Sequence, residues 1–357
     1  MLPTDASPEE SSTLLKWRSS LGHHSVSSLY FWTSSLCNTT HSNLTVSPCT
    51  WYGISHNQVG SMIEINLIRA NVKGSLDEFP LSSLSHLMYM NLSVNSLSGH
   101  ILPQISLLSN LTYLDLSIDK FLGLIPPDIG HLTKLEVLHL AFNELNGSIP
   151  LKIGQLHWLS EVALCLNQLD GYIPSLLGNL RKLARVYAYD NSLSDSIPPE
   201  MGKMINLKVL HMDTNFLTRP IPSTIGNLTK LRKLHLFANK LNGSIPLELG
   251  NSNLLISLSL YNNNLIGSIL SILGNLTELT LLYLYDNYGL SILNLRMNSL
   301  SGTIPQTSSL RSSLRTLGFS QNQFEGTLPQ SFVNSKNLEV LDLSNNKIVD
   351  KFPTWLV

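Results

Sequence analysis

The sequence predicts an α/β-type solenoid of stacked 24-residue repeats, each of which contributes one short strand to a parallel sheet. Three observations lead to this prediction. An asparagine place recurs at a constant interval, an alternating apolar run precedes it, and a segment with helical signals comes before the first repeat. Together they predict a helical cap followed by a long repeat array.

The repeat unit is L-x-x-L-x-L-x-x-N-x-L-x-G-x-I-P, and residues 135–150, LEVLHLAFNELNGSIP, show it most clearly. Its asparagine place recurs every 24 residues as Asn95, Asp119, Asn143, Asn167, Asn191, Asn215, Asn239, Asn263 and Asn287. After a break it returns with the same spacing at Asn298, Asn322 and Asn346. A weaker first copy has Ala70 in this place, so thirteen copies are predicted, counting the interrupted one.

The x-L-x-L segment of each copy alternates with period two, as a short strand with one buried face does. Stacking successive copies at about 4.8 Å would pair each strand with the next one in a parallel sheet. The leucines are predicted to face the interior. The residues between them are predicted to face outward.

The other fixed places also have a structural interpretation. An asparagine amide has both a donor and an acceptor, which can satisfy backbone groups inside a tight coil. Asp119 supplies only the acceptor when it is ionised, so this repeat is predicted to be weaker. Gly147 and its equivalents permit a backbone shape that a side chain resists, and Pro150 stands where no N–H is needed.

The 24-residue spacing is interrupted between Asn287 and Asn298, which are only 298 − 287 = 11 residues apart. Seven earlier copies have a second glycine four residues after the proline place, at Gly130, Gly154, Gly178, Gly202, Gly226, Gly250 and Gly274. The two copies after the break have Ser309 and Val333 there. Two interpretations are open: a junction near residue 288 between pieces of two related proteins, by recombination or a mis-predicted gene model, or a deletion of thirteen residues.

The segment SPEESSTLLKWRSSLG, residues 7–22, is typical of a helix that ends before Gly22. Ser7 is the expected N-cap, Pro8 occupies the first helical position, and Glu10 is expected to complete a capping box. An apolar stripe is predicted from Leu14, Trp17 and Leu21.

Composition and charge exclude several classes of protein. Lys and Arg number 23 against 24 Asp and Glu, which leaves no basic footprint for nucleic acid. The sequence contains no apolar stretch of membrane-spanning length, and its first twelve residues lack the pattern of a signal peptide. We therefore expect no nucleic-acid partner and no direct membrane insertion of this chain.

The variable residues beside the central leucines are predicted to form columns across the concave sheet. From residue 185 to 286 these columns are rich in aromatic and histidine side chains, which offer large contact area at low entropic cost. Favoured exposed strand residues could produce the same pattern. We expect ligand binding by Arg185, Tyr187, Tyr189, His211, Asp213, Lys233, His235, Phe237, Tyr261, Tyr283, Tyr285 and Asp286.

The unit with L-x-G-x-I-P resembles the plant-specific leucine-rich repeat over nearly the whole chain after about residue 60. The resemblance implies a right-handed leucine-rich-repeat solenoid, mostly short parallel strands with 3-10 or irregular segments on the convex side. Residues 1–58, which include SPCTWYGIS, resemble the N-terminal cap of plant leucine-rich-repeat receptor kinases. Residues 59–287 resemble the ectodomains of peptide-sensing receptor kinases. Residues 288–357 resemble the C-terminal repeats of plant receptor-like proteins, and we expect them to be truncated.

The cap of that family ends in P-C-x-W-x-G-I-x-C, and here His56 replaces its last cysteine. The resemblance implies a disulfide between the two cap cysteines, so Cys49 either stays free or pairs with Cys37. A metal site formed by Cys37, Cys49, His41 and His56 matches no standard zinc spacing, and no metal site is predicted. Cys165 is predicted to be a lone thiol in a strand segment.

Eight N-x-S/T sequons are candidate glycosylation sites in a secreted array: Asn38, Asn43, Asn91, Asn110, Asn146, Asn227, Asn242 and Asn275. The repeat consensus itself produces Asn-Leu-Thr and Asn-Gly-Ser, which weakens the count as evidence for secretion. A glycan on Asn91 would obstruct part of the concave face.

The sequence contains no kinase, hydrolase, metalloprotease or phosphate-binding motif, so we expect no enzyme activity and no cofactor. The resemblance implies a ligand-binding ectodomain, or a fragment of one, that recognises a peptide or protein in development or defence signalling. It also implies a possible leucine-rich-repeat co-receptor, and a location in the apoplast or at the extracellular face of the plasma membrane. The alternatives are a secreted inhibitor of a cell-wall-degrading enzyme, similar to polygalacturonase inhibitors, and a truncated product without function.

Overall fold

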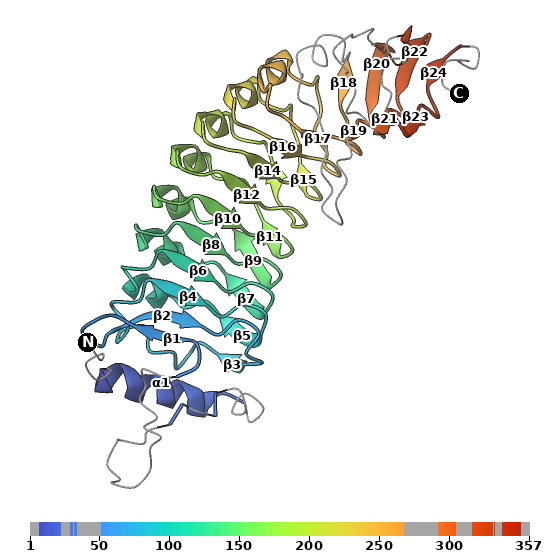
Figure 1. Cartoon of the computed structure of the whole chain (residues 1–357). Coiled ribbons are helices and arrows are strands. Elements are labelled where there is room, and N and C mark those ends of the chain that lie inside the picture. The colour runs from blue at the N-terminus through green and yellow to red at the C-terminus, as the bar shows by residue number, and fades with distance from the viewer. Residues whose placement is uncertain are drawn as a thin grey trace. The chain divides into compact units, whose positions relative to one another are not determined.

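The computed structural model describes residues 7–22, 29–30, 32–33, 51–267, 292–304, 316–330, 332 and 338–350. The chain divides into two compact units, Met1–Asp170 and Gly171–Val357. Each unit is a stack of repeats with a parallel sheet on one side and short 3-10 helices on the other (Figure 1). The predicted solenoid with a helical cap is therefore confirmed. The predicted boundary at residue 288 stays a prediction.

Unit 1 opens with helix α1 (Pro8–Ser20), which the Ser7 side chain caps by accepting a hydrogen bond from Glu10 N at 3.5 Å. Leu14 and Trp17 are fully buried, as the apolar stripe predicted. The second half of the predicted capping box is wrong, because Ser7 N donates to Gly60 O instead. The Glu10 carboxylate accepts from Met62 N at 2.9 Å, and so joins the cap to the first repeat strand.

The main sheet of unit 1 begins with an antiparallel pair and continues as a parallel stack. Its order is β1 (Ile54–His56), β2 (Met62–Asn66), β4 (Tyr89–Asn91), β6 (Tyr113–Asp115), β8 (Val137–His139) and β10 (Glu161–Ala163). From β4 onward each residue pairs with the residue 24 positions later, as Tyr113 does with Val137. The 24-residue period of the sequence therefore equals the separation, along the chain, of residues that pair in the sheet.

A second parallel sheet and three 3-10 helices are the other elements of unit 1 among the described residues. The sheet contains β3 (Lys73–Ser75), β5 (Ser96–His100), β7 (Lys120–Leu124), β9 (Glu144–Ser148) and β11 (Gln168–Asp170). The helices are η3 (Pro103–Leu107), η4 (Pro127–His131) and η5 (Leu151–Gln155). Leu114, Leu138 and Leu140 are fully buried, so the core lies between the main sheet and the helices.

Unit 2 repeats this arrangement. Its main-sheet strands are β12 (Arg185–Tyr187), β14 (Val209–His211), β16 (Lys233–His235), β17 (Ser257–Ser259), β19 (Ile292–Asn294), β21 (Thr316–Gly318) and β23 (Val340–Asp342). Smaller ladders join β13 (Ser194–Asp195) to β15 (Phe216–Leu217), and β18 (Ile266–Gly267) to β20 (Ser299–Thr303), β22 (Gln323–Gly326) and β24 (Lys347–Ile348). The described 3-10 helices are η6 (Ser175–Asn179), η7 (Pro199–Lys203), η8 (Ser223–Asn227) and η9 (Leu247–Asn251).

The break in the repeat is bridged by direct pairing of β17 with β19, in which Leu258 lies opposite Leu293. Asn298 then takes the place that the regular spacing gives to Asn287. Its side chain donates to Leu260 O at 3.1 Å and accepts from Leu265 N at 3.1 Å. The array thus passes from the Asn263 repeat to the Asn298 repeat in one step. Asn287 itself, Ser309 and Val333 lie outside the described residues.

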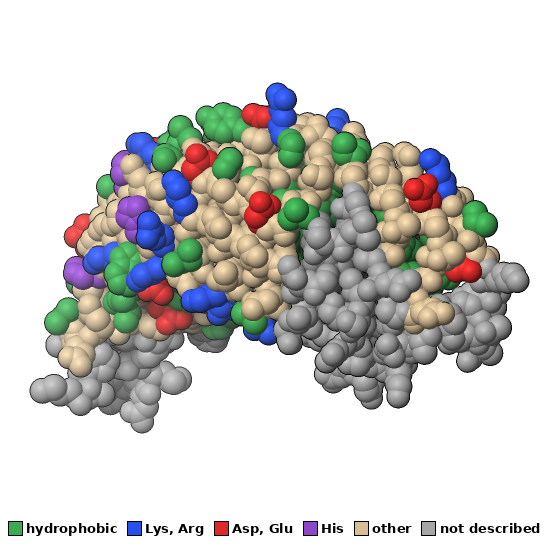
Figure 2. Space-filling model, turned by 90° about the horizontal axis from the view of Figure 1, so that it is seen from above, with side chains coloured by type: hydrophobic (Ala, Val, Ile, Leu, Met, Phe, Trp, Pro, Cys, Tyr) green, Lys and Arg blue, Asp and Glu red, His purple; other side chains and the backbone are tan. Residues whose placement is uncertain are grey.

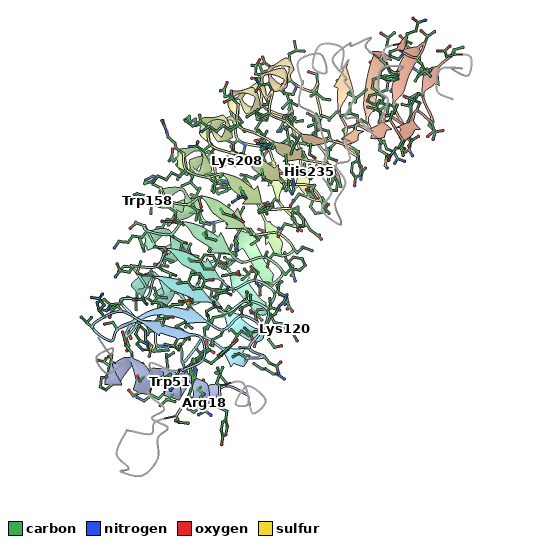
Figure 3. All side chains as sticks on the ribbon, in the orientation of Figure 1. Arg18, Trp51, Lys120, Trp158, Lys208 and His235 are labelled. Carbon is green, nitrogen blue, oxygen red and sulfur yellow. The ribbon has the colours of Figure 1, made fainter. Side chains whose placement is uncertain are left out.

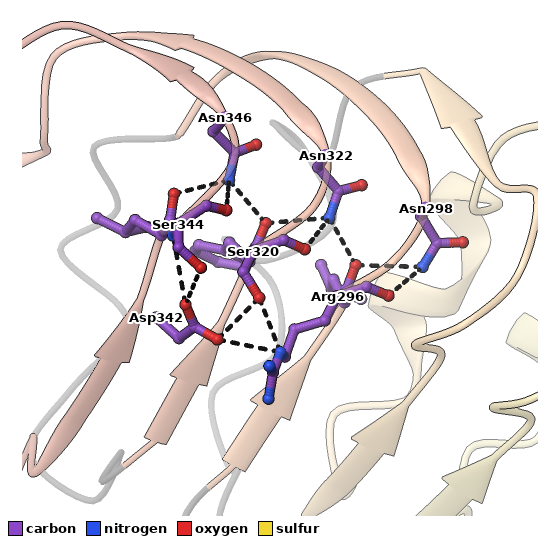
Figure 4. A network of polar contacts seen from close by, with 10 residues as sticks. Arg296, Asn298, Ser320, Asn322, Asp342, Ser344 and Asn346 are labelled. Carbon is purple, nitrogen blue, oxygen red and sulfur yellow. Dashed lines mark hydrogen bonds and ion pairs between the residues drawn. The ribbon is translucent and has the colours of Figure 1, made fainter.

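The asparagine ladder follows the predicted chemistry (Figure 4). Asn322 donates through Nδ2 to Phe319 O at 3.0 Å and to Leu295 O in the preceding repeat at 2.9 Å. Its Oδ1 accepts from Leu300 N at 3.0 Å. One amide therefore satisfies backbone groups of two repeats, which an apolar side chain could not do.

Asp119 interrupts this ladder in unit 1. Its Oδ1 accepts from Leu97 N at 2.8 Å, whereas Oδ2 is buried without a hydrogen-bond partner. Burial raises the pKa of Asp119 to about 8, despite hydrogen bonds from the backbone of Leu97 and Asn95. Because Oδ2 has no partner in the described structure, the Asp119 carboxyl lacks the hydrogen bonds that the asparagine amides donate in other repeats. The predicted weakness of this repeat stays a prediction.

We expect the Asp119→Asn variant to be more stable than the wild type, by about 2 kcal/mol at pH 8. The folded carboxyl keeps its proton up to about pH 8, whereas the unfolded carboxyl loses it near 3.8. The wild type therefore loses stability as the pH rises through this window, and the variant does not. Denaturant unfolding at pH 5 and pH 8 measures the difference. A pH-independent gain, or an equal effect of Asp170→Asn at an exposed site, would contradict the interpretation.

The glycine of L-x-G-x-I-P adopts the left-handed conformation, with φ +67° at Gly147. A Cβ there would also lie 2.3 Å from Leu124 Cδ2, so the predicted need for glycine is confirmed. A second left-handed position was not predicted. It directly precedes the asparagine place and is held by ordinary residues such as Val94 (φ +60°) and Ile118 (φ +59°). The ladder thus imposes a costly backbone shape on residues that do not favour it.

The cap cysteines Cys37 and Cys49, together with His41, lie outside the described residues, so their pairing stays a prediction. Cys165 is buried just after β10 and is not part of a disulfide. Among the sequons, Asn146, Asn227 and Asn242 are exposed, Asn110 is half-buried and Asn91 is buried. Asn91 Oδ1 accepts from both Ser93 N and Ser93 Oγ. This burial disfavours glycosylation of Asn91. Asn38, Asn43 and Asn275 lie outside the described residues.

Within the described residues, every helix falls short of the length and apolar character needed to cross a membrane.

Candidate functional site

The predicted ligand-binding residues lie on adjacent strands of unit 2, on the face of the main sheet opposite the buried leucines. We call the described members the aromatic–histidine patch. They are Arg185, Tyr187, Tyr189, His211, Asp213, Lys233, His235, Phe237 and Tyr261. Figure 3 marks His235 within this sheet. The other three predicted residues, Tyr283, Tyr285 and Asp286, lie outside the described residues.

Strand register explains why these side chains meet. Tyr187 lies opposite His211, His211 opposite His235, and His235 opposite Ser259. Because alternate residues of a strand face the same side, Asp213 lies beside His211 on that face. The columns inferred from the 24-residue period are therefore real rows of neighbouring side chains.

The rings of the patch form a continuous series of contacts. The edge of one ring in the Tyr187–His211 pair meets the face of the other, with centroids 5.5 Å apart. His211 stacks on His235 at 4.1 Å, and Phe237 stacks on Tyr261 at 4.5 Å. The His235 and Phe237 rings, 6.3 Å apart, connect the two stacks. Such packing orders large, rigid side chains before any ligand arrives.

Both patch histidines are neutral at physiological pH. Burial, together with the nearby charges of His235 and Lys233, lowers the pKa of His211 to about 3. Burial and Lys233 likewise lower the pKa of His235 to about 4. The stacked pair is thus a neutral surface and not a cationic one.

Asp213 is the acidic member of the patch and is only 6% exposed. Burial and the charge of Asp190 raise its pKa to about 7, although hydrogen bonds from its own backbone and from Thr214 oppose the rise. In the described part of the chain, Asp213 forms no ion pair with lysine or arginine. A buried carboxylate without such a partner is costly.

Ser257 was not among the predicted site residues, although it contacts a residue of the patch. It is fully buried, and its Oγ lies 2.6 Å from His235 Nε2. The sequence signal that could have identified Ser257 is its position 24 residues after Lys233, which places the two residues opposite each other in the sheet. A serine there draws no attention in the sequence, because only the fold shows which ring it touches.

Unit 1 has a comparable cluster that the predicted site did not include. The Tyr89 and Tyr113 rings stack at 4.3 Å, and His139 lies 3.5 Å from Asp115 Oδ2 and 3.3 Å from Glu161 Oε1. Burial alone would lower the pKa of His139, but the two carboxylates raise it to about 9. This histidine is therefore a cation within an ionic cluster, unlike the neutral pair in unit 2.

A third polar group lies on the last described strands (Figure 4). Arg296 Nε donates to Ser320 Oγ at 2.8 Å and lies 3.1 Å from Asp342 Oδ2. Ser320 Oγ also donates to Asp342 at 2.8 Å. These side chains satisfy one another, so we assign this network a structural role.

Hollows and charge add little to the chemistry of the patch. A hollow of about 380 Å³ is lined by Asp77, Phe79 and Leu102 of unit 1, and the residues that line it include none from the patch. Basic and acidic side chains are interspersed on the face shown in Figure 2. The patch itself lies on one face of the parallel sheet, across the neighbouring strands β12, β14 and β16.

Comparison with known sequences agrees with the repeat structure. A family model described as a leucine-rich repeat region matches residues 65–219. A second model, described as a leucine-rich repeat, matches residues 313–335 and 337–357. A probable leucine-rich repeat receptor-like protein kinase of Arabidopsis thaliana is 39% identical over 103 residues, which are 29% of this chain and 9% of that protein.

Two solved Arabidopsis ectodomain structures cover almost the whole chain. The receptor kinase HAESA, in complex with the peptide hormone IDA and the co-receptor SERK1, matches with a TM-score of 0.79 and 29% identity. The match covers 96% of this chain and 54% of the HAESA chain in that structure. The ectodomain of the plant membrane receptor kinase GASSHO1/SCHENGEN3, in complex with CASPARIAN STRIP INTEGRITY FACTOR 2, matches at 0.75 and 28%, covering 97% and 48%.

The fold, the asparagine ladder and these matches define the class: the chain is a leucine-rich-repeat protein. Within that class it is similar to the ectodomains of plant leucine-rich-repeat receptor kinases. It spans about half of the solved ectodomains and 9% of the curated relative.

Proposed function

We propose that this chain is the ligand-binding ectodomain, or part of the ectodomain, of a plant cell-surface receptor. It recognises a peptide or protein through the aromatic–histidine patch, and a leucine-rich-repeat co-receptor is a possible further partner. Development and defence signalling are the processes in which we expect it to act.

The observation that supports this proposal most strongly is the row of stacked rings across β12, β14, β16 and the residues that follow them. Aromatic side chains that are ordered and only partly covered have the character of binding hot spots. HAESA, whose structure contains both a peptide hormone and a co-receptor, supports the same interpretation by its similarity.

We further propose that the chain acts by binding and not by catalysis. Its two histidines are stacked and neutral. The hydroxyl in contact with His235, Ser257 Oγ at 2.6 Å from Nε2, belongs to a fully buried residue and is out of reach of a substrate. By analogy with the membrane receptor kinase ectodomains that it resembles, its location is the extracellular face of the plasma membrane or the apoplast.

Selection from a library of synthetic 10–20-residue peptides tests the proposal, with the secreted, glycosylated chain as bait. We expect the selected peptides to lose binding when the patch is truncated. Tyr187→Ala, Phe237→Ala and Tyr261→Ala should each weaken binding roughly 5- to 30-fold, because each removes a rigid aromatic contact. Isothermal titration calorimetry gives the affinities.

Trp158→Ala is the matched control, since Trp158 is a large exposed aromatic that is absent from the patch. It should leave binding unchanged. Circular dichroism and melting of each variant separate loss of binding from loss of fold. The proposal is wrong if every selected peptide binds the patch variants and the wild type equally well.

A further inference from the structure

We infer that His211, Asp213 and His235 form a binding site for a divalent transition-metal ion, with Zn²⁺ as its simplest representative. One nitrogen from each histidine and one carboxylate oxygen of Asp213 lie within 4.8 Å of one another. Two imidazoles and one carboxylate are a common donor set for Zn²⁺ and related ions. The inference does not depend on peptide binding.

The sheet holds the three donors in place. His211 and Asp213 are two residues apart at the end of β14, so they share a face, and His235 occupies the same register position on β16 as His211. The rings of His211 and His235 are 4.1 Å apart and nearly parallel, with 10° between their planes. Zinc bonds of about 2.0–2.2 Å then require only modest side-chain rotation on a rigid backbone.

A second observation points to a missing ligand. His211 Nε2 is buried and has no hydrogen-bond partner in the described structure. Native proteins rarely leave such an atom unsatisfied without a water, ion or functional reason. Asp213, buried without a basic partner, has the complementary need for a cation. A single metal ion bound between them would satisfy both groups.

The surroundings resemble those of a metal ligand set. The hydroxyl of Ser257 lies 2.6 Å from His235 Nε2 and fixes the orientation of that ring, as outer-sphere hydrogen bonds do in metal sites. Nearby charges act in opposite directions, because Asp190 attracts a cation whereas Lys233 repels one. Three protein donors leave a fourth position open for water or for a donor atom of a bound molecule.

Zinc titration of the chelator-treated full chain, purified without a histidine tag, tests the inference. Isothermal titration calorimetry should show one Zn²⁺ per chain. His211→Gln, Asp213→Asn and His235→Gln should each weaken binding more than roughly 100-fold, and Ser257→Ala roughly 10-fold. His139→Gln is the matched control, since it removes a histidine that lies between two carboxylates in unit 1, and it should not change the affinity.

Hydrogen exchange of the unmutated protein gives a test that needs no variant. Zinc should slow exchange in the peptides that contain residues 209–213 and 233–235. Absence of saturable binding to the wild type, equal binding by the three ligand variants, loss of binding in His139→Gln, or protection confined to other strands would each overturn the assignment. Peptide binding by the zinc-free protein tests the proposed function separately. If it persists, the proposed function is supported, whether or not the protein binds zinc.

Discussion

Replacing Asn239 by alanine is expected to destabilise the fold by about 3–5 kcal/mol. The Asn239 amide donates to Met212 O at 3.0 Å in the preceding repeat. It also donates to Leu236 O at 3.1 Å and to Phe237 O at 3.2 Å. Its Oδ1 accepts from Leu217 N at 2.9 Å. Alanine leaves several of these buried backbone groups unsatisfied, and each such group costs about 1–3 kcal/mol.

Denaturant unfolding followed by circular dichroism measures the loss, and hydrogen exchange locates it. The amide of Leu217 should lose protection first, because it loses its acceptor directly. Asn242→Ala makes the same chemical change at an exposed position of the same repeat and should shift stability by less than about 0.5 kcal/mol. If the two variants unfold alike, the ladder does not stabilise the stack as argued.

The second large effect is expected from Gly226→Ala in η8. A Cβ on Gly226 would lie 2.2 Å from Glu248 O and 2.5 Å from Glu248 C in the next repeat. Both atoms belong to the backbone of η9, so the clash cannot be relieved by rotating a side chain. Overpacking of this kind costs about 1–3 kcal/mol, and here we expect a loss of about 3 kcal/mol, because two helices must separate.

Gly22→Ala is the control for this substitution, since the nearest atom to its Cβ would be Lys73 O at an ordinary 3.5 Å. Thermal unfolding of both variants is the measurement. We expect a clear drop in melting temperature for Gly226→Ala and almost none for Gly22→Ala. Equal melting temperatures would show that the helices separate without cost.

The close approach of the 3-10 helices also explains four of the glycines that follow the proline place, namely Gly130, Gly178, Gly202 and Gly226. The sequence analysis used them only to detect a change of consensus after the break. Gly178 and Gly202 show the same close contacts as Gly226, each with a backbone oxygen of the next repeat. Their function is packing between repeats, which a single repeat read in isolation does not reveal.

For the candidate site, too, the sequence predicted one part of the arrangement and only the structure showed the rest. The period alone placed Tyr187, His211 and His235 in one column, because residues 24 apart lie opposite each other in the sheet. The period could not show that the two histidine rings stack or that Asp213 is buried beside them. Ring packing and burial depend on side-chain torsions and on neighbours from other strands.

The sequence by itself determined the repeat, its inward leucines, the asparagine ladder and the start of the cap helix, because these follow from local periodicity and capping chemistry. Only the tertiary structure decided how the array crosses its break, where β17 pairs with β19 over an irregular interval. It also placed Glu10 on Met62 and made neutral neighbours of His211 and His235. Such contacts join residues far apart in the chain, and the free energy of packing, not local propensity, selects them.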